Sequence, residues 1–203
     1  MDRYKTIRRA ASARLVRRGS RFVGLAHPVA SPEQVRRLLK EIKARHHNAT
    51  HHCYAYRLIG REGISASSDD GGEPARSAGL PILRVLEAQG LMNTLVVVVR
   101  YFGGTKLGIG GLIRAYGDAA RETLAQAEVI TEIRKAWLAL RYPLELTAEV
   151  MRTVKRYGAE IEGQDYAERS RLIVSLPASQ VEDLRRALGE ATSGRVEFGE
   201  LPH

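Results

Sequence analysis

Residues 95–116 are LVVVVRYFGGTKLGIGGLIRAY, and this stretch decides the fold of the first part of the chain. The apolar run Leu95–Val99 is typical of a strand that is buried on both faces. From Ile109 to Ala120 apolar residues recur at helical spacing, which predicts a helix. The loop between them is rich in glycine. Backbone N–H groups in such a loop can converge on an anion, and the helix dipole adds to the attraction.

Positive side chains bracket this glycine loop, and an aromatic ring beside it could stack on a base. The predicted phosphate- or nucleic-acid-binding residues are Arg100, Tyr101, Gly103, Gly104, Lys106, Gly110, Gly111 and Arg114. The spacing matches neither the Walker phosphate loop nor the dinucleotide fingerprint, so it predicts no nucleotide cofactor. A purely architectural role is the alternative, because glycine also serves tight turns with positive φ.

The net charge of +9 on 203 residues is distributed unevenly. Residues 1–131 hold 21 Lys and Arg against 11 Asp and Glu, a net charge of +10, whereas residues 132–203 hold 11 against 12, a net charge of −1. A partner that carries phosphates accounts for a basic first part. A solvated basic surface is the alternative.

Cysteine content and hydropathy indicate the compartment. The single cysteine excludes an internal disulfide and suits a reducing cytosol. No apolar run approaches the roughly 20 residues that a membrane-spanning helix needs. The Arg- and Ala-rich residues 1–22 superficially resemble a transit peptide, but their alternating stretches could pair into a sheet. We therefore expect a soluble, cytoplasmic protein without membrane contact.

Periodicity predicts two α+β domains, the first over residues 1–131. Its strands are expected at 22–26, 52–59, 64–67 and 95–99. Three helices are expected: one that begins at a capping box formed by Ser31 and Gln34, one at 81–89, and one that begins near Ile109. The pattern resets near residue 131, so residues 132–203 form the second domain. Its expected elements are a strand at 134–141, a helix at 143–157, strands at 160–167 and 171–176, a helix opened by a Ser179–Glu182 capping box, and a strand at 195–199. This βαββαβ order is the ferredoxin-like motif.

An acidic loop, SSDDGGEPARSAG at residues 67–79, is the second dense feature. Its three carboxylates could hold Mg²⁺ or supply a general base in an enzyme. Asp and Gly are also ordinary turn formers, and Asp70 could accept N–H bonds within the loop. We favour a structural or partner-contacting loop. The expected supporting cleft contains His52, Asp70, Glu73 and Arg76.

Four histidines and Cys53 lie within residues 46–53. A zinc site needs further ligands, and neither a second cysteine nor a distant histidine cluster supplies them, so we expect no metal and no cofactor. On a strand, His51 and Cys53 point to one face and His52 to the other. Cys53 lacks the partners of a nucleophile and suits a small buried site. No catalytic residue is assigned, and we expect a binding protein more readily than an enzyme.

Several segments together resemble the IMPACT/YigZ family over nearly the whole chain, from about Tyr4. These segments are Ser20–Phe22, His51–Tyr54, Asp69–Gly71 with Glu73-Pro74, Ala78–Pro81 and Arg100–Tyr116. The resemblance implies a first domain similar to a small-subunit ribosomal protein and to domain IV of elongation factor G. It implies a ferredoxin-like second domain similar to domain V of that factor. The chain departs from the family pattern in the additional glycine of Gly71-Gly72, and in Arg76, where a glycine is common.

Eukaryotic members of this family regulate translation initiation by competing with a stress kinase for its ribosome-associated activator. They use an additional N-terminal domain that this sequence does not show, so we do not carry over that activity. Resemblance and charge together predict a non-catalytic, cytoplasmic RNA- or ribosome-binding protein that takes part in translation regulation. One alternative is a hydrolase or transferase whose cleft lies between Asp69–Glu73 and the glycine loop. Another is a regulator that binds protein.

Overall fold

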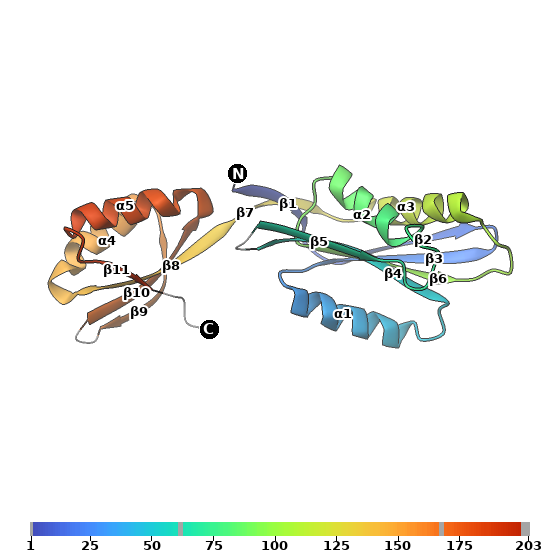
Figure 1. Ribbon diagram of the computed structural model, residues 1–203, viewed down its shortest axis with the longest axis horizontal. Helices are drawn as coiled ribbons and strands as arrows, with labels where there is room; N and C mark the ends of the chain where they lie inside the picture. The colour runs from blue at the N-terminus through green and yellow to red at the C-terminus, as the bar shows by residue number, and fades with distance from the viewer. Residues whose placement is uncertain (1, 61–62, 167–168, 200–203) are drawn as a thin grey trace. The chain divides into compact units, whose positions relative to one another are not determined.

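The structure is a computed structural model that describes residues 2–60, 63–166 and 169–199. The chain divides into two compact units (Figure 1). The N-terminal unit comprises Tyr4–Glu132, and the C-terminal unit comprises Ile133–His203 together with Met1–Arg3. Within the described residues, no helix is long and apolar enough to cross a membrane.

A five-stranded antiparallel sheet forms the centre of the N-terminal unit, in the order β2-β3-β6-β4-β5. Its strands are β2 (Ala11–Arg17), β3 (Ser20–Pro28), β4 (His51–Gly60), β5 (Gly63–Asp69) and β6 (Thr94–Tyr101). The central position of β6 explains its apolar run, since both of its faces are covered. β1 (Arg3–Ile7) and β7 (Val129–Ile133) pair in a separate two-stranded sheet. The N-terminal segment that resembles a transit peptide therefore supplies strands of the fold.

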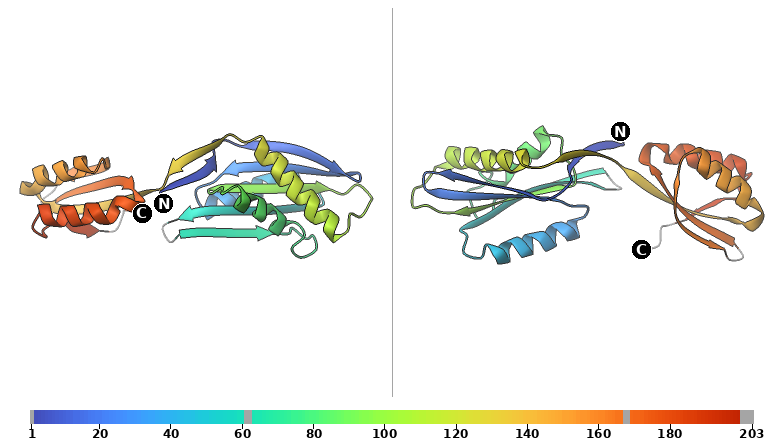
Figure 2. Two further views of the ribbon diagram at one scale, coloured as in Figure 1. Left: turned by 90° about the horizontal axis from the view of Figure 1, so that it is seen from above. Right: turned by 180° about the vertical axis from the view of Figure 1, so that it is seen from behind.

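Helices cover both faces of this sheet (Figure 2). α2 (Gly79–Ala88) and α3 (Ile109–Ala125) lie on one face, and α1 (Pro32–Arg45) lies on the other. Alternate residues of β6 serve two cores: Val96 and Val98 pack towards α2 and α3, whereas Val97 and Val99 pack towards α1. The predicted α+β class is confirmed.

The capping box predicted at the start of α1 forms with a shift of one residue. Ser31 Oγ accepts a hydrogen bond from the N–H of Gln34 at 3.3 Å. Gln34 Oε1 accepts from the N–H of Ala30 at 2.8 Å, and not from that of Ser31. Both bonds satisfy donors at the helix entry, which is the function of such a box.

The C-terminal unit is a four-stranded antiparallel sheet in the order β11-β8-β10-β9, with two helices. Its elements are β8 (Lys135–Pro143), a 3₁₀ turn η1 (Leu144–Leu146), α4 (Thr147–Arg156), β9 (Glu160–Tyr166), β10 (Arg169–Pro177), a 3₁₀ turn η2 (Ala178–Gln180), α5 (Val181–Ala191) and β11 (Glu197–Gly199). This is the predicted βαββαβ order. Residue 167, the last of the strand predicted at 160–167, lies outside the described residues.

The predicted Ser179–Glu182 capping box is wrong. Ser179 lies in η2, and its N–H donates to the Asp2 carboxylate at 2.9 Å, while its hydroxyl donates to the same carboxylate. Gln180 occupies the N-cap of α5 without a side-chain bond. The serine therefore ties the N-terminal segment to this unit.

Candidate functional site

The glycine loop, residues 102–108, connects the end of β6 to the start of α3 and lies at the surface. Gly104 and Gly108 have φ values of 85° and 71°, a conformation that glycine adopts without strain. Gly108 is the N-cap of α3, and no side chain caps this helix end. The loop thus presents backbone and a positive helix end to solvent.

Two neighbouring segments hold the glycine loop in place. Gly103 lies against the turn between β2 and β3, so closely that a Cβ on Gly103 would be 2.0 Å from the carbonyl carbon of Gly19. Its N–H donates to Ser20 Oγ at 3.2 Å. On the other side, the N–H of Phe102 donates to Thr50 Oγ1 at 3.1 Å. The loop is therefore anchored at its start and exposed beyond it.

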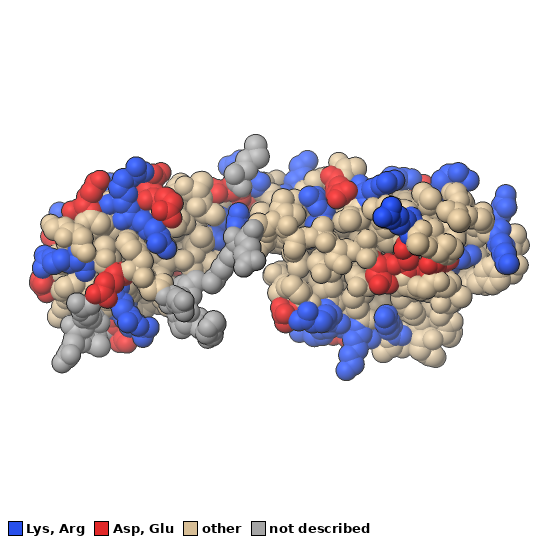
Figure 3. Space-filling view, in the orientation of Figure 1, with Lys and Arg blue, Asp and Glu red and all other residues tan. Residues whose placement is uncertain are grey.

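The turn between β2 and β3 places two further cations beside the glycine loop, and neither is among the predicted phosphate-binding residues. Arg18 lies in this turn with a φ of 46°, and Arg21 follows on β3. The Arg21 guanidinium lies 4.3 Å from the centre of the Tyr101 ring, because Arg21 and Tyr101 pair in register. Lys106 is exposed on the loop itself. At the end of the unit where these turns lie in Figure 1, several Lys and Arg side chains are visible at the surface among uncharged atoms (Figure 3).

Arg100 differs from this exposed set, which corrects the expectation that it contacts phosphate. It is only 5% exposed. Its Nη1 donates to Glu73 Oε1 at 2.7 Å, and the Phe22 and Phe102 rings lie 5.6 and 5.4 Å from its guanidinium. The physical reason is strand alternation: Arg100 shares the face of Val96 and Val98, which α2 and α3 cover.

Glu73 is the centre of a buried polar cluster beneath the loop. Its Oε1 also accepts a bond from the Tyr116 hydroxyl at 2.7 Å, and its Oε2 lies 3.8 Å from His51 Nε2. Burial raises the pKa of Tyr116, so this hydroxyl stays protonated and donates. Arg100 Nη2 reaches Ser20 Oγ at 3.4 Å, and its Nε has no partner among the described residues. The cluster joins the acidic loop, β6 and α3.

Asp70 organises the acidic loop. Its carboxylate accepts bonds from the N–H groups of Arg76, Ala78 and Gly79 at 2.7, 2.9 and 2.8 Å. Burial acts to raise the pKa of Asp70, but these backbone bonds outweigh it and hold the pKa below its ordinary value. The expectation that Asp70 accepts N–H bonds within the loop is confirmed. Arg76 has a φ of 62°, which explains why a glycine suits this position.

Cys53 and the histidines alternate as predicted. Cys53 is fully buried, its Sγ donates to the Asp70 carbonyl at 2.9 Å, and burial raises the pKa of its thiol to about 12. His51 Nδ1 lies 2.9 Å from the Gly71 carbonyl, whereas His52 Nε2 lies 3.1 Å from the His46 carbonyl on the other side of the strand. Of the residues predicted for the supporting cleft, His52 therefore lies on the other side of the strand from the acidic loop, and His51 adjoins that loop.

The remaining predicted residues lie at the start of α3. Gly110 and Gly111 are in its first turn. Arg114 lines a cavity of about 370 Å³ between α2 and α3, together with Arg84 and Arg121. Among the described residues, no group of three His, Cys, Asp or Glu side chains could hold a metal ion.

Comparisons with known proteins match both units. The model of the Impact N-terminal domain matches residues 18–124, and that of a domain of unknown function, DUF1949, matches residues 143–195. IMPACT family member YvyE of Bacillus subtilis is 42% identical over 127 residues, which are 63% of this chain and 58% of that protein.

Two further relatives match over most of their length. An IMPACT family member encoded in the pol 5′ region of Thermus thermophilus is 38% identical over 178 residues, 87% of this chain and 96% of that one. The crystal structure of a hypothetical protein superposes with a TM-score of 0.74 at 26% identity and covers 100% of this chain and 99% of that chain.

Proposed function

Because the chain belongs to the IMPACT family, we propose that it is a non-catalytic, cytoplasmic protein that binds RNA, free or within the ribosome, and regulates translation. The observation that carries RNA binding is the exposed glycine loop with Arg18, Arg21 and Lys106 around it. The translational setting is the one that the family resemblance implies. A cytoplasmic location suits a chain whose one cysteine is a buried thiol.

Electrostatics support a polyanionic partner for the N-terminal unit. The carboxylates beside the loop are occupied: Glu73 pairs with Arg100, and Asp70 accepts backbone bonds. The exposed cations are therefore not neutralised by these acids, and the positive end of α3 adds to their field. Neutralising phosphates releases counterions, which makes such binding steeply salt-dependent.

The same contacts give little support to the hydrolase or transferase alternative. A general base needs a carboxylate that can reach a substrate proton. Glu73 is buried in an ion pair, and three backbone N–H groups hold the Asp70 carboxylate. The high pKa of Cys53 keeps its thiol protonated, which disfavours a nucleophilic role.

Charge reversal at the loop tests the proposal. We expect Arg18→Glu with Lys106→Glu to weaken binding of a fluorescein-labelled uridine oligomer of about ten nucleotides by about tenfold, measured by anisotropy. The loss of two phosphate contacts should also reduce the slope of log K against log salt by about 1.4. The matched control is Lys40→Glu with Lys43→Glu, which changes the net charge equally on the exposed side of α1.

A non-specific effect of net charge would weaken both double variants equally. That result would refute the loop as the binding site, and so would unchanged affinity in a loop variant whose circular dichroism shows an intact fold.

A further inference from the structure

The four-stranded sheet of the C-terminal unit has one face towards α4 and α5 and an opposite, open face (Figure 1). Leu140 and Leu172 point to the helical side and belong to its core. Side chains alternate along a strand, so the open face carries Trp137, Ala139 and Arg141 of β8. No described helix of this unit covers that face.

Two arginines oppose each other at the centre of the open face. Arg141 of β8 and Arg171 of β10 are paired in register. Like charges directly opposite each other destabilise a sheet. Asp165 lies opposite Arg171 on the outer strand β9, and Glu197 lies opposite Arg141 on the outer strand β11.

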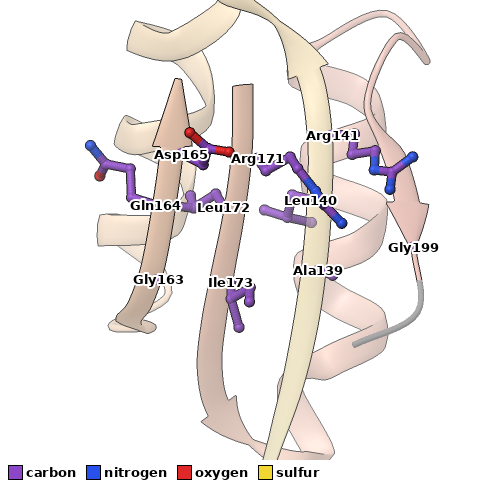
Figure 4. Close-up of a pocket in the computed structure, with 10 residues that line it drawn as sticks. All are labelled: Ala139, Leu140, Arg141, Gly163, Gln164, Asp165, Arg171, Leu172, Ile173 and Gly199. Atoms are coloured by element: carbon purple, nitrogen blue, oxygen red, sulfur yellow. The ribbon is translucent and has the colours of Figure 1, made fainter. Parts of the chain in front are cut away.

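Figure 4 shows how these side chains lie. Arg171 extends from β10 over β8, and Arg141 extends from β8 towards β11, so both lean in the same direction. The Asp165 side chain leans from β9 towards β10. Each guanidinium has five N–H donors and no acceptor, so an anion that binds between the two would satisfy donors and relieve their repulsion.

An apolar hollow adjoins the arginines. In the next row of the sheet Gly163, Ile173, Ala139 and Gly199 lie side by side, and the two outer residues have no side chain. A cavity of about 170 Å³ lies there, with Ile173 and Ala139 in its lining. Beyond it on β8 lies Trp137, 46% exposed. Trp137 pairs in register with Ser175, whose hydroxyl donates to the Glu162 carboxylate, so the apolar row lies between this polar pair and the arginines. An apolar row beside an aromatic ring suits a planar base.

From this juxtaposition we propose that the open face of the C-terminal sheet, from the Arg141–Arg171 pair to Trp137, binds single-stranded RNA. The arginines take the backbone phosphates, and a base stacks on the indole. Arg141 lies four positions along β8 from Trp137, a distance of about 13 Å at 3.3 Å per residue, which leaves room for another base over the hollow. The proposal rests on RNA being the partner proposed above, but not on the glycine loop.

The charge of this unit defines what kind of binding to expect. Residues 132–203 carry a net charge of −1, so long-range attraction is weak and affinity depends on stacking. Two phosphate contacts give a salt slope of only about −1.4 for a single strand. This shallow dependence differs from the steep one expected of the basic N-terminal unit.

Intrinsic fluorescence gives a readout confined to this face, because Trp137 is the only tryptophan of the chain. Titration of the full chain with an unlabelled uridine oligomer of about ten nucleotides should quench its emission saturably. Arg141→Gln with Arg171→Gln should weaken this binding at least fivefold. The double variant should fold, because it removes a like-charge pair.

Stacking is tested by substituting the indole and following binding through the anisotropy of the labelled oligomer. Trp137→Ala should weaken binding about fivefold to 140-fold for this site, and Trp137→Phe should restore most of the loss. The matched control for the Arg141/Arg171 double variant is Arg152→Gln with Lys155→Gln on α4. It removes the same charge on the helical side and should leave the quenching of Trp137 unchanged.

The two proposals fail in different ways. If anisotropy shows that the oligomer binds but Trp137 emission is not quenched, the sheet-face proposal is overturned and the glycine-loop proposal is retained. Equal losses in the Arg141/Arg171 and Arg152/Lys155 variants also overturn it. If the oligomer quenches Trp137 and the Arg18/Lys106 variant binds it normally, the glycine-loop proposal is overturned and the sheet-face proposal is retained. Absence of RNA binding in both assays overturns both.

Discussion

Glu73→Gln should lower the free energy of unfolding of the N-terminal unit by about 3–5 kcal/mol, because it leaves the Arg100 guanidinium buried and uncompensated. The side chains of Arg100 and Glu73 are only 6% and 4% exposed, and their polar atoms lie 2.7 Å apart. The exposed Arg36–Glu33 pair is the comparison: its side chains are 68% and 70% exposed, and such pairs contribute about 0.5 kcal/mol or less.

Urea unfolding followed by far-ultraviolet circular dichroism measures this difference from the shift in midpoint at constant slope. Trp137 belongs to the other unit, so its fluorescence should keep its transition and serve as an internal control. Replacing both partners, Glu73→Leu with Arg100→Met, should recover only part of the loss. The apolar pair contains no unpaired charge, but the buried Tyr116 hydroxyl loses its acceptor. A cost below about 1 kcal/mol for Glu73→Gln would refute a buried pair under the loop.

Three further predictions concern the surroundings of the loop. Gly103→Ala should cost about 1–3 kcal/mol, measured as a lower urea midpoint, because its Cβ would lie 2.0 Å from the backbone of Gly19; an unchanged midpoint would contradict this packing. Arg76→Gly should stabilise the unit by up to about 1 kcal/mol, since a φ of 62° disfavours arginine, and destabilisation would show that the side chain matters more than the backbone. Burial, followed by the charges of Arg45 and Arg21, lowers the pKa of His46, so the unfolded chain takes up its proton first as pH falls. Stability should therefore be level above pH about 6.5 and decrease below it. His46→Gln should reduce the difference between the urea midpoints measured about one pH unit above and about one pH unit below this value.

Most of the fold could be predicted from periodicity, and the capping-box error has a cause that is distant in sequence. The βαββαβ order of the C-terminal unit and the buried strand β6 follow from alternation and run length. The Ser179 error arose because a capping box is a local pattern, whereas Asp2, which binds that serine, is distant in sequence. Local patterns cannot show that a distant carboxylate competes for the same donor.

The candidate site could be predicted only in part, because exposure depends on pairing between strands. The sequence places the glycine loop, but the approach of Arg18 and Arg21 depends on the register of β3 with β6. The Arg17-Arg18-Gly19 turn signal was present, yet nothing local relates it to residue 103. The histidine alternation was predicted, whereas its outcome, His51 beside the acidic loop, needed the fold of that loop.

Arg100 shows how alternation could have corrected the site. Val96, Val98 and Arg100 are spaced by two residues on a buried strand, which places the guanidinium in a core and requires a buried acid as its partner. Glu73 is that acid, so Arg100 supports the loop from below while Lys106 meets the solvent above it. Substitutions at Arg100 should therefore weaken RNA binding only in proportion to the fraction of unfolded protein, whereas those at Lys106 should weaken it at unchanged stability. Loss of binding in a fully folded Arg100 variant would contradict this division.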